Sequence, residues 1–142
     1  MQRLRLNHLA ALVFLGSLLL GVPALRAQVA GPDSAFSANV NDTGRIRALA
    51  VQPDGKILVG GYFTDIGGVA RSNLSRLSTS GAVESAATFS TVALTDLDIN
   101  AVAVQPDGKI IIAGSFDNVA GLNRKKIVRL KADGTIEGTN TF

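Results

Sequence analysis

Short apolar runs separated by turn residues dominate the chain after residue 45 and predict a β-rich structure. Gln52-Pro53-Asp54-Gly55 separates the first two runs. Proline presets φ at the first corner of such a turn, and glycine accepts a positive φ without a clash. A Gly-containing loop, Tyr62–Ser72, precedes the third run. Strands joined in this way pair antiparallel. Four strands are predicted, at Arg45–Val51, Lys56–Gly61, Asn73–Ser78 and near Ala82–Phe89.

The whole pattern recurs 53 residues later. Aligning Arg47–Phe89 with Asn100–Phe142 gives 19 identities in 43 pairs without a gap. Phe36 lies another 53 residues before Phe89. The segment before the first unit therefore resembles the end of an earlier unit. Internal repetition at this period is typical of blade or solenoid architectures. The predicted division is a leader at 1–27, a tail strand of a preceding or ring-closing unit at 28–45, and repeats at 46–98 and 99–142.

The second strand of each unit is too apolar for a sheet with one face in water. Ile110–Ala113 has no polar alternation, so both of its faces are expected to be covered. Gly60 and Gly61 leave room for a neighbouring backbone. A small sheet covered on both sides by copies of itself is the packing of propeller blades. The sequence predicts an all-β fold, with two four-stranded antiparallel blades of an incomplete β-propeller. A β-solenoid, whose coils are usually shorter, and a single sandwich, which has no need to repeat its sequence, are the alternatives.

The repeated motif also carries a family resemblance, over roughly residues 29–142. The turn-and-lysine motif, followed by Phe63, Gly68, an Arg-Leu strand and a closing Phe89, resembles the delta-60 repeat proteins. The resemblance implies a secreted or surface-associated bacterial β-propeller with no established catalytic activity. One departure is that the closing acid is a glutamate five residues before the phenylalanine, at Glu84 and Glu137; Asp33, three residues before Phe36, is nearer the usual form. The motif residues are Gln52, Pro53, Asp54, Gly55 and Lys56, and Gln105, Pro106, Asp107, Gly108 and Lys109.

The first 27 residues have the order of a secretory signal peptide. Two arginines precede the apolar stretch Leu9–Leu20, Pro23 ends it, and the small residue Ala27 offers a cleavage site. A transmembrane anchor is the alternative. However, Leu9–Val22 has 14 residues, against the roughly 20 that a spanning helix needs. We therefore expect a signal-peptide helix that is cleaved near Ala27, a secreted or cell-envelope location, and no stable membrane span.

Composition narrows the chemistry of the remaining chain. Three of the 14 basic residues lie in the leader, which leaves 11 bases against 11 acids and no net charge to attract nucleic acid. His8 is the one histidine, and there is no cysteine. These counts exclude Ser-His-Asp and Cys-His catalysis and His/Cys zinc sites after Ala27. We expect no catalytic residue, no cofactor, no metal site and no enzymatic activity.

Three groups of polar residues are candidate sites. Asp96, Asp98 and Asn100 copy the start of a calcium loop, but Ala101 stands where the loop needs glycine, which favours a solvated turn. A basic cluster around Lys125 has no interleaved aromatic residues, so no nucleic-acid partner is expected. Recurring arginines are expected to tie loops or neighbouring blades together. They are Arg71 and Arg124, and Arg76 and Arg129.

Two blades are too few for a ring, because propellers close with four to eight. The expected partners are further blades, in the same chain of a longer protein or by self-association. A fragment is favoured, since terminal repeats are usually atypical and polar. The predicted function is a non-catalytic scaffold or adhesion module that binds an unidentified protein or glycan through loops at one mouth of the ring. The loops Thr64–Ser72 and Asp117–Lys125 differ most between the copies, as binding loops would, but unconstrained surface loops would differ in the same way. The alternative is a propeller hydrolase or lyase with its catalytic residues in further blades or a downstream domain.

Overall fold

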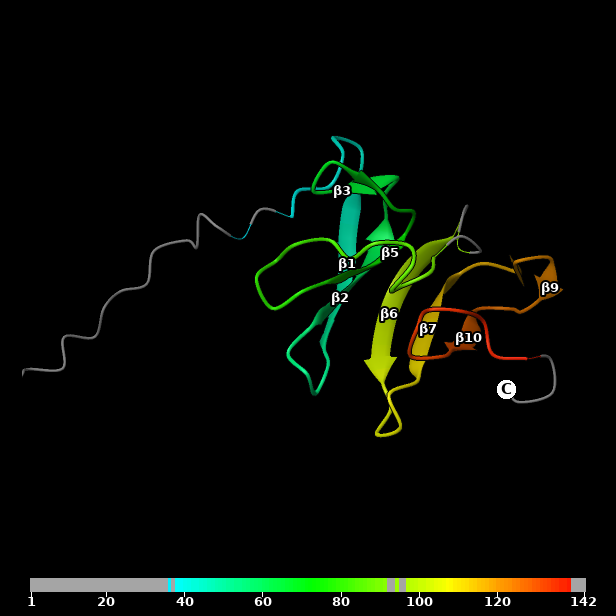
Figure 1. Ribbon diagram of the computed structural model, residues 1–142. Coiled ribbons are helices and arrows are strands. Elements are labelled where there is room, and N and C mark those ends of the chain that lie inside the picture. Colours follow the sequence, from blue (N-terminus) through cyan, green and yellow to red (C-terminus); the bar gives the residue numbers. More distant parts are fainter. Residues whose placement is uncertain (1–35, 37, 92–93, 95–96, 139–142) are drawn as a thin grey trace, which may run out of the picture. The chain divides into compact units, whose positions relative to one another are not determined.

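The described part of the chain is made of strands, turns and connecting loops. The structure, a computed structural model, describes residues 36, 38–91, 94 and 97–138, which belong to one compact unit, Pro32–Phe142 (Figure 1). The predicted leader, residues 1–27, lies outside the described residues, as do Phe142 and most of the tail segment before Ala38. Within the described ranges, no helix is long and apolar enough to cross a bilayer.

Each repeat forms one three-stranded antiparallel sheet (Figure 1). In both sheets the second strand of the repeat is central, with the first and third strands at its sides. Strand β6 of the second sheet lies against β1 and β2 of the first. The first sheet contains β1 (Arg45–Val51), β2 (Ile57–Tyr62) and β5 (Leu74–Leu77), and the second contains β6 (Asp98–Val104), β7 (Ile110–Ser115) and β10 (Ile127–Leu130).

The predicted fourth strand is wrong for most of its length. In each repeat it is reduced to a single bridge, Leu77 to Val83 and Leu130 to Ile136. After Glu84 the first repeat turns away from the sheet edge, because the Phe89 amide donates a hydrogen bond of 3.0 Å to the carbonyl of Ser85. That contact closes a helical type of turn and withdraws the chain from sheet pairing.

The predicted loop between the second and third strands contains a small hairpin in each repeat. The tip in the first repeat is Gly67-Gly68, with φ values of 59° and 73°. The second repeat has Ala120 at φ 50° in place of the first glycine. Positive φ at two successive tip residues matches the twist of a tight two-residue hairpin. The strands are β3 (Asp65–Ile66) and β4 (Val69–Ala70), and β8 (Asn118–Val119) and β9 (Leu122–Asn123).

The core has two parts, one on each side of the first sheet. Leu58 faces the second sheet and belongs to the larger cluster, which includes Ile99, Ile110 and Ile112. Its neighbour Val59 points the other way, into a smaller cluster. Both are at most 2% exposed. The expectation that an apolar second strand is covered on both faces is therefore confirmed for β2. It is wrong for Ile110–Ala113 in β7, because Ile111 and Ala113, on the face turned away from the first sheet, are only partly buried.

The glycines at the end of β2 make room for two different neighbours. A Cβ on Gly60 would lie 2.7 Å from a methyl group of Val102 in the second sheet. A Cβ on Gly61 would lie 2.0 Å from the carbonyl oxygen of Arg45, beside the register shift between β1 and β2. The expected close backbone approach exists at Gly61, but it comes from the same sheet. At Gly60 the neighbour is the side-chain surface of the second sheet.

Two phenylalanines 53 residues apart make the same contact in successive repeats. Phe36 lies over Gly81, and Phe89 lies over Gly134; a Cβ at either glycine would be 3.0 Å or less from the ring. Phe89 is 1% exposed between the two sheets, whereas Phe36 remains 41% exposed. The same local contact therefore becomes a buried one only where a second sheet is present.

Replacing Phe89 with alanine should destabilise the protein by about 3–5 kcal/mol, the usual cost of emptying a buried aromatic site. The matched control is Phe36→Ala, which should cost less than about 2 kcal/mol because that ring is already partly in water. Urea unfolding of residues 28–142, followed by circular dichroism, measures both values. Equal losses would contradict the assignment of Phe89 to the contact between the sheets.

Candidate functional site: the ion-paired turns

The repeated motif forms the same turn in both sheets. In the first, the amide of Gly55 donates to the carbonyl of Gln52 at 2.9 Å, and Gly55 has φ 82°. Gly108 repeats this contact with Gln105 at 2.9 Å and φ 81°. The turn therefore requires glycine at this position, since other residues are strained at such φ values.

Pro53 and Gln52 of the first turn meet their counterparts at one end of the two sheets. Val51, Gln52 and Pro53 line a shallow recess of about 310 Å³ together with Val104, Gln105 and Pro106. The Oε1 atoms of both glutamines are buried, so the recess presents mainly proline and valine surface. Both turns lie at the lower end of the sheets in Figure 1.

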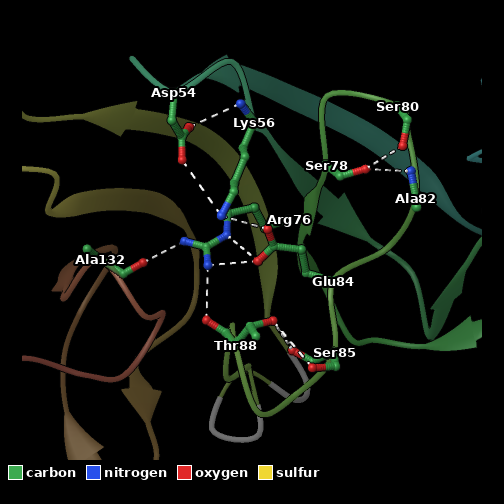
Figure 2. Close-up of polar contacts among 10 residues, drawn as sticks. All are labelled: Asp54, Lys56, Arg76, Ser78, Ser80, Ala82, Glu84, Ser85, Thr88 and Ala132. Carbon is green, nitrogen blue, oxygen red and sulfur yellow. Dashed lines mark hydrogen bonds and ion pairs between the residues drawn. The ribbon is translucent and has the colours of Figure 1, made fainter.

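The lysine of the motif and the closing glutamate hold each blade together. Lys56 Nζ lies 2.9 Å from Glu84 Oε1, and Arg76 donates through Nε to Glu84 Oε2 at 2.8 Å (Figure 2). One carboxylate thus joins the turn after β1 to strand β5. The second repeat has the same trio, with Lys109 2.9 Å from Glu137 and Arg129 paired with that glutamate. The closing acid is therefore a glutamate with the same structural role in both repeats, although the resemblance in the sequence implied a different acid at this position.

The positive partners control the pKa of both glutamates. Burial of Glu84 raises its pKa, but hydrogen bonds from Lys56 and Arg76 outweigh that effect and hold the pKa below its usual value. The hydrogen bond from Lys109, together with Arg129, lowers the pKa of Glu137. Both carboxyl groups therefore remain ionised at neutral pH, which suits a structural ion pair.

Arg76 also connects the first blade to the second. Its Nη1 donates to the carbonyl of Ala132 at 2.8 Å, and its Nη2 donates to the carbonyl of Thr88 at 3.0 Å (Figure 2). The guanidinium carbon lies 4.5 Å from the centre of the Phe89 ring, a cation–π geometry. The expectation that a recurring arginine ties neighbouring blades together is therefore confirmed for Arg76.

The turn aspartates bond within their own turns. Asp54 and Asp107 each accept a hydrogen bond from the backbone amide two residues later, at 3.1 and 3.2 Å. The amide of Lys109 is the main reason that the pKa of Asp107 is lowered. Over the ranges 38–91 and 97–138, the structure brings together no group of three or more His, Cys, Asp or Glu that could hold a metal.

The calcium-like triplet does not form the expected turn. Asp98 begins strand β6 and pairs with Arg47 of the first sheet at 3.0 Å, and Asn100 continues the strand. Asp96 lies outside the described residues. The prediction of a solvated turn is therefore wrong for Asp98 and Asn100. Asp98 pairs with Ser115 of β7, and Asn100 lies within β6 at the register shift between Ile99 and Ala101.

Three further basic residues have local structural contacts. Arg71 donates through Nη2 to the carbonyl of Glu84 at 2.7 Å, and Arg124 reaches the carbonyl of Gly138 at 3.3 Å. Lys126 pairs with Asp117 at 3.1 Å. The recurring arginine at 71 and 124 therefore ties the hairpin loop to the end of its own repeat.

Asn73 is a structural residue that its sequence context did not reveal. Its Oδ1 accepts a hydrogen bond from the amide of Phe63, and its Nδ2 donates to the carbonyl of Leu94 at 2.8 Å. It is 3% exposed and has φ 65°. Asparagine tolerates positive φ better than most residues, but Lys126 has φ 66° at the equivalent position. An asparagine at this position therefore did not by itself predict the positive φ or the buried hydrogen bonds.

Glu84→Gln should remove the charge that Lys56 and Arg76 stabilise and cost about 1–3 kcal/mol at pH 7. A lowered folded-state pKa means that this stabilisation is present above the ordinary glutamate range and is lost as pH falls through the lowered pKa. The wild-type urea midpoint should therefore drop between pH 6 and pH 3, and the variant should drop less. Asp42→Asn, on an exposed turn, is the control and should change stability at pH 7 by less than about 0.5 kcal/mol. An unchanged pH dependence in Glu84→Gln would contradict the role of the ion pair.

Comparison with known proteins agrees with the geometry. Residues 52–86 and 105–139 each match a family described as a domain of unknown function (DUF5122) beta-propeller. The two matches start 53 residues apart, which is the period of the repeat. No curated protein and no solved structure matches the chain. The antiparallel sheets, the turn geometry and these matches together support a β-propeller repeat family.

Proposed function

We propose that this chain contributes blades to an exported β-propeller that acts as a non-catalytic scaffold for binding or adhesion. The proposal is based on one observation: the polar side chains that both repeats share bind other parts of the framework. Lys56, Arg76 and Glu84 bind one another across the blade, and Arg76 reaches the next blade as well. Side chains engaged in this way serve the framework, which leaves recognition to parts that vary between the repeats.

The finer family assignment is the delta-60 repeat type, and it supports a bacterial secreted or envelope protein. The motif Gln52–Lys56 and its copy Gln105–Lys109 support that assignment. The basic and apolar leader that ends near Ala27 supports export. In this proposal, further blades of the same kind complete the propeller.

The proposed ligand contacts lie on the hairpin loops Thr64–Ser72 and Asp117–Lys125. Each loop follows the central strand of its sheet, at the end opposite the repeated turn. The turns are identical in the two repeats, whereas the loops differ at most positions. Rigid sheets that carry variable loops are a common arrangement for binding a protein or a glycan.

Export can be tested by expressing the full chain in a bacterial host. We expect a secreted or periplasmic product that begins at Gln28, because cleavage follows the small residue Ala27. Fractionation and N-terminal sequencing measure this, and deletion of Leu9–Leu20 is the control that should retain the protein in the cytosol. Wild-type protein that stays in the cytosol at full length would contradict export.

Binding can be tested with residues 28–142 on a glycan array. We expect at least one bound glycan and a loss of about tenfold or more when the exposed loop residues Asn118, Asn123 and Lys125 are replaced by serine, since about 1.4 kcal/mol of contact energy corresponds to tenfold. Lys131→Ser, an exposed change outside the loop, is the control. Turnover of a substrate that depends on a residue within 28–142 would overturn the non-catalytic proposal.

A further inference from the structure

The outer face of the first sheet contains an apolar hollow of about 140 Å³. We call it the hollow face. Leu49 at its rim is 64% exposed and Ile46 is 44% exposed, while Val59 and Leu77 are buried. Exposed apolar side chains gathered around a recess on a sheet face make this face a candidate binding surface. The residues of the hollow face used below are Ile46, Leu49, Ile57, Val59, Ile66 and Leu77.

The equivalent hollow in the second repeat is already filled, and the chain itself shows what fills it. The counterparts of the six hollow-face residues all belong to, or pack against, the cluster that contains Leu58 and Leu74 of the first sheet. Leu58 and Leu74 are both fully buried there. The six counterparts are Ile99, Val102, Ile110, Ile112, Val119 and Leu130.

The outer face of the second sheet carries the residues that would fill the first hollow. Ile111 and Ile127 stand 53 residues after Leu58 and Leu74. We call them the ridge face. Ile127 is 44% exposed, whereas Leu74 is 0% exposed. Ile111 is only partly buried. Among the described residues, the filling pair is thus uncovered on one side of the unit and the hollow is unfilled on the other.

The side chains on the two outer faces have nearly the same volumes as their counterparts in the contact between the two sheets. Both ridge substitutions exchange leucine for isoleucine, which keeps the side-chain volume. Three hollow residues, Ile46, Ile57 and Leu77, are identical to their counterparts. Leu49 and Ile66 are each one methylene larger than their counterparts, Val102 and Val119. Val59 is one methylene smaller than its counterpart, Ile112, and so compensates for one of these differences. Volume-conserving exchanges of this kind are tolerated in packed contacts.

We propose that the ridge face of one copy of this chain binds the hollow face of a second copy, head to tail. The proposal rests on the assignment of the sheets as propeller blades and names the second copy as their partner. Ile111 and Ile127 enter the hollow, and Arg129 donates to the carbonyl of Thr79 in the second copy, as Arg76 does to Ala132 within the chain. Because the two faces differ, the contact is heterologous and each copy keeps one face for the next.

Repeated head-to-tail contacts lead to a closed ring when the rotation between blades permits closure. Propellers close with about four to eight blades, which corresponds to about two to four copies of the segment 28–142 if each repeat is one blade. The ion pair between Arg47 and Asp98 has no charged equivalent in this contact, since Asn100 and Arg45 occupy the matching positions. The apolar faces therefore supply the main attraction between copies.

The test uses residues 28–142, which include the whole described compact unit. Leu49→Asp places a charge in the hollow face, and Ile127→Asp places one on the ridge face. Light scattering coupled to gel filtration, between about 1 and 200 μM, measures the mass of each protein alone and of the equimolar mixture. These concentrations bracket the affinity range of ordinary weak to moderate contacts.

Wild-type protein should assemble beyond the monomer, and each variant alone should be monomeric. The mixture should form a 1:1 dimer and grow no further, because the intact ridge face of Leu49→Asp meets the intact hollow face of Ile127→Asp. Lys131→Asp, at an exposed position outside both faces, is the matched control and should assemble as wild type. Circular dichroism checks folding, and Leu49→Ser with Ile127→Ser replaces the pair if an aspartate variant unfolds.

A monomeric wild type at all concentrations would overturn the inference, as would a mixture that stays monomeric. So would a symmetric contact, in which one variant alone still dimerises. The proposed scaffold function would survive each of these results, because further blades of a longer chain could cover the same faces. Substrate turnover, in contrast, would overturn the proposed function and leave the assembly measurement unaffected.

Discussion

The contact between two apolar sheet faces is the constraint on which the rest of this structure depends. A three-stranded sheet of this size cannot bury both of its faces by itself. Leu58 and Leu74 are fully buried because the second sheet covers them, and the corresponding Ile127 is exposed because nothing among the described residues does so. Burial of apolar surface is the dominant favourable term in folding. The two repeats therefore stabilise each other through the face that they share.

The polar residues of the repeat set the geometry in which those faces meet. Glu84 joins Lys56 of the turn to Arg76 of strand β5, and the same arginine then reaches the carbonyl of Ala132 in the next blade. A planar guanidinium can serve a carboxylate, a carbonyl and an aromatic ring at once, which a lysine cannot do. One buried side chain thus links the interior of a blade to its neighbour, and Phe89 completes the contact.

The sequence predicted the elements that local chemistry controls. The turn at Gln52–Lys56, the antiparallel pairing and the doubly covered strand β2 are all present, because proline, glycine and apolar runs act over a few residues. The fourth strand was mispredicted, since the Ser85–Phe89 turn withdraws the chain from the sheet edge. The role of Asn73 was also missed, because its partner Leu94 lies 21 residues away and can be identified only from the fold.

The sequence by itself determined the repeat, its period, the turn chemistry and the all-β class. These properties follow from residue types at fixed spacings, which a single chain displays directly. Only the tertiary structure decided which copy of each residue is buried and which is exposed. Leu74 and Ile127 have nearly the same chemistry and the same local position, and they differ because one faces another sheet. The exposure of a side chain depends on which part of the fold packs against it, and the local sequence does not contain that information.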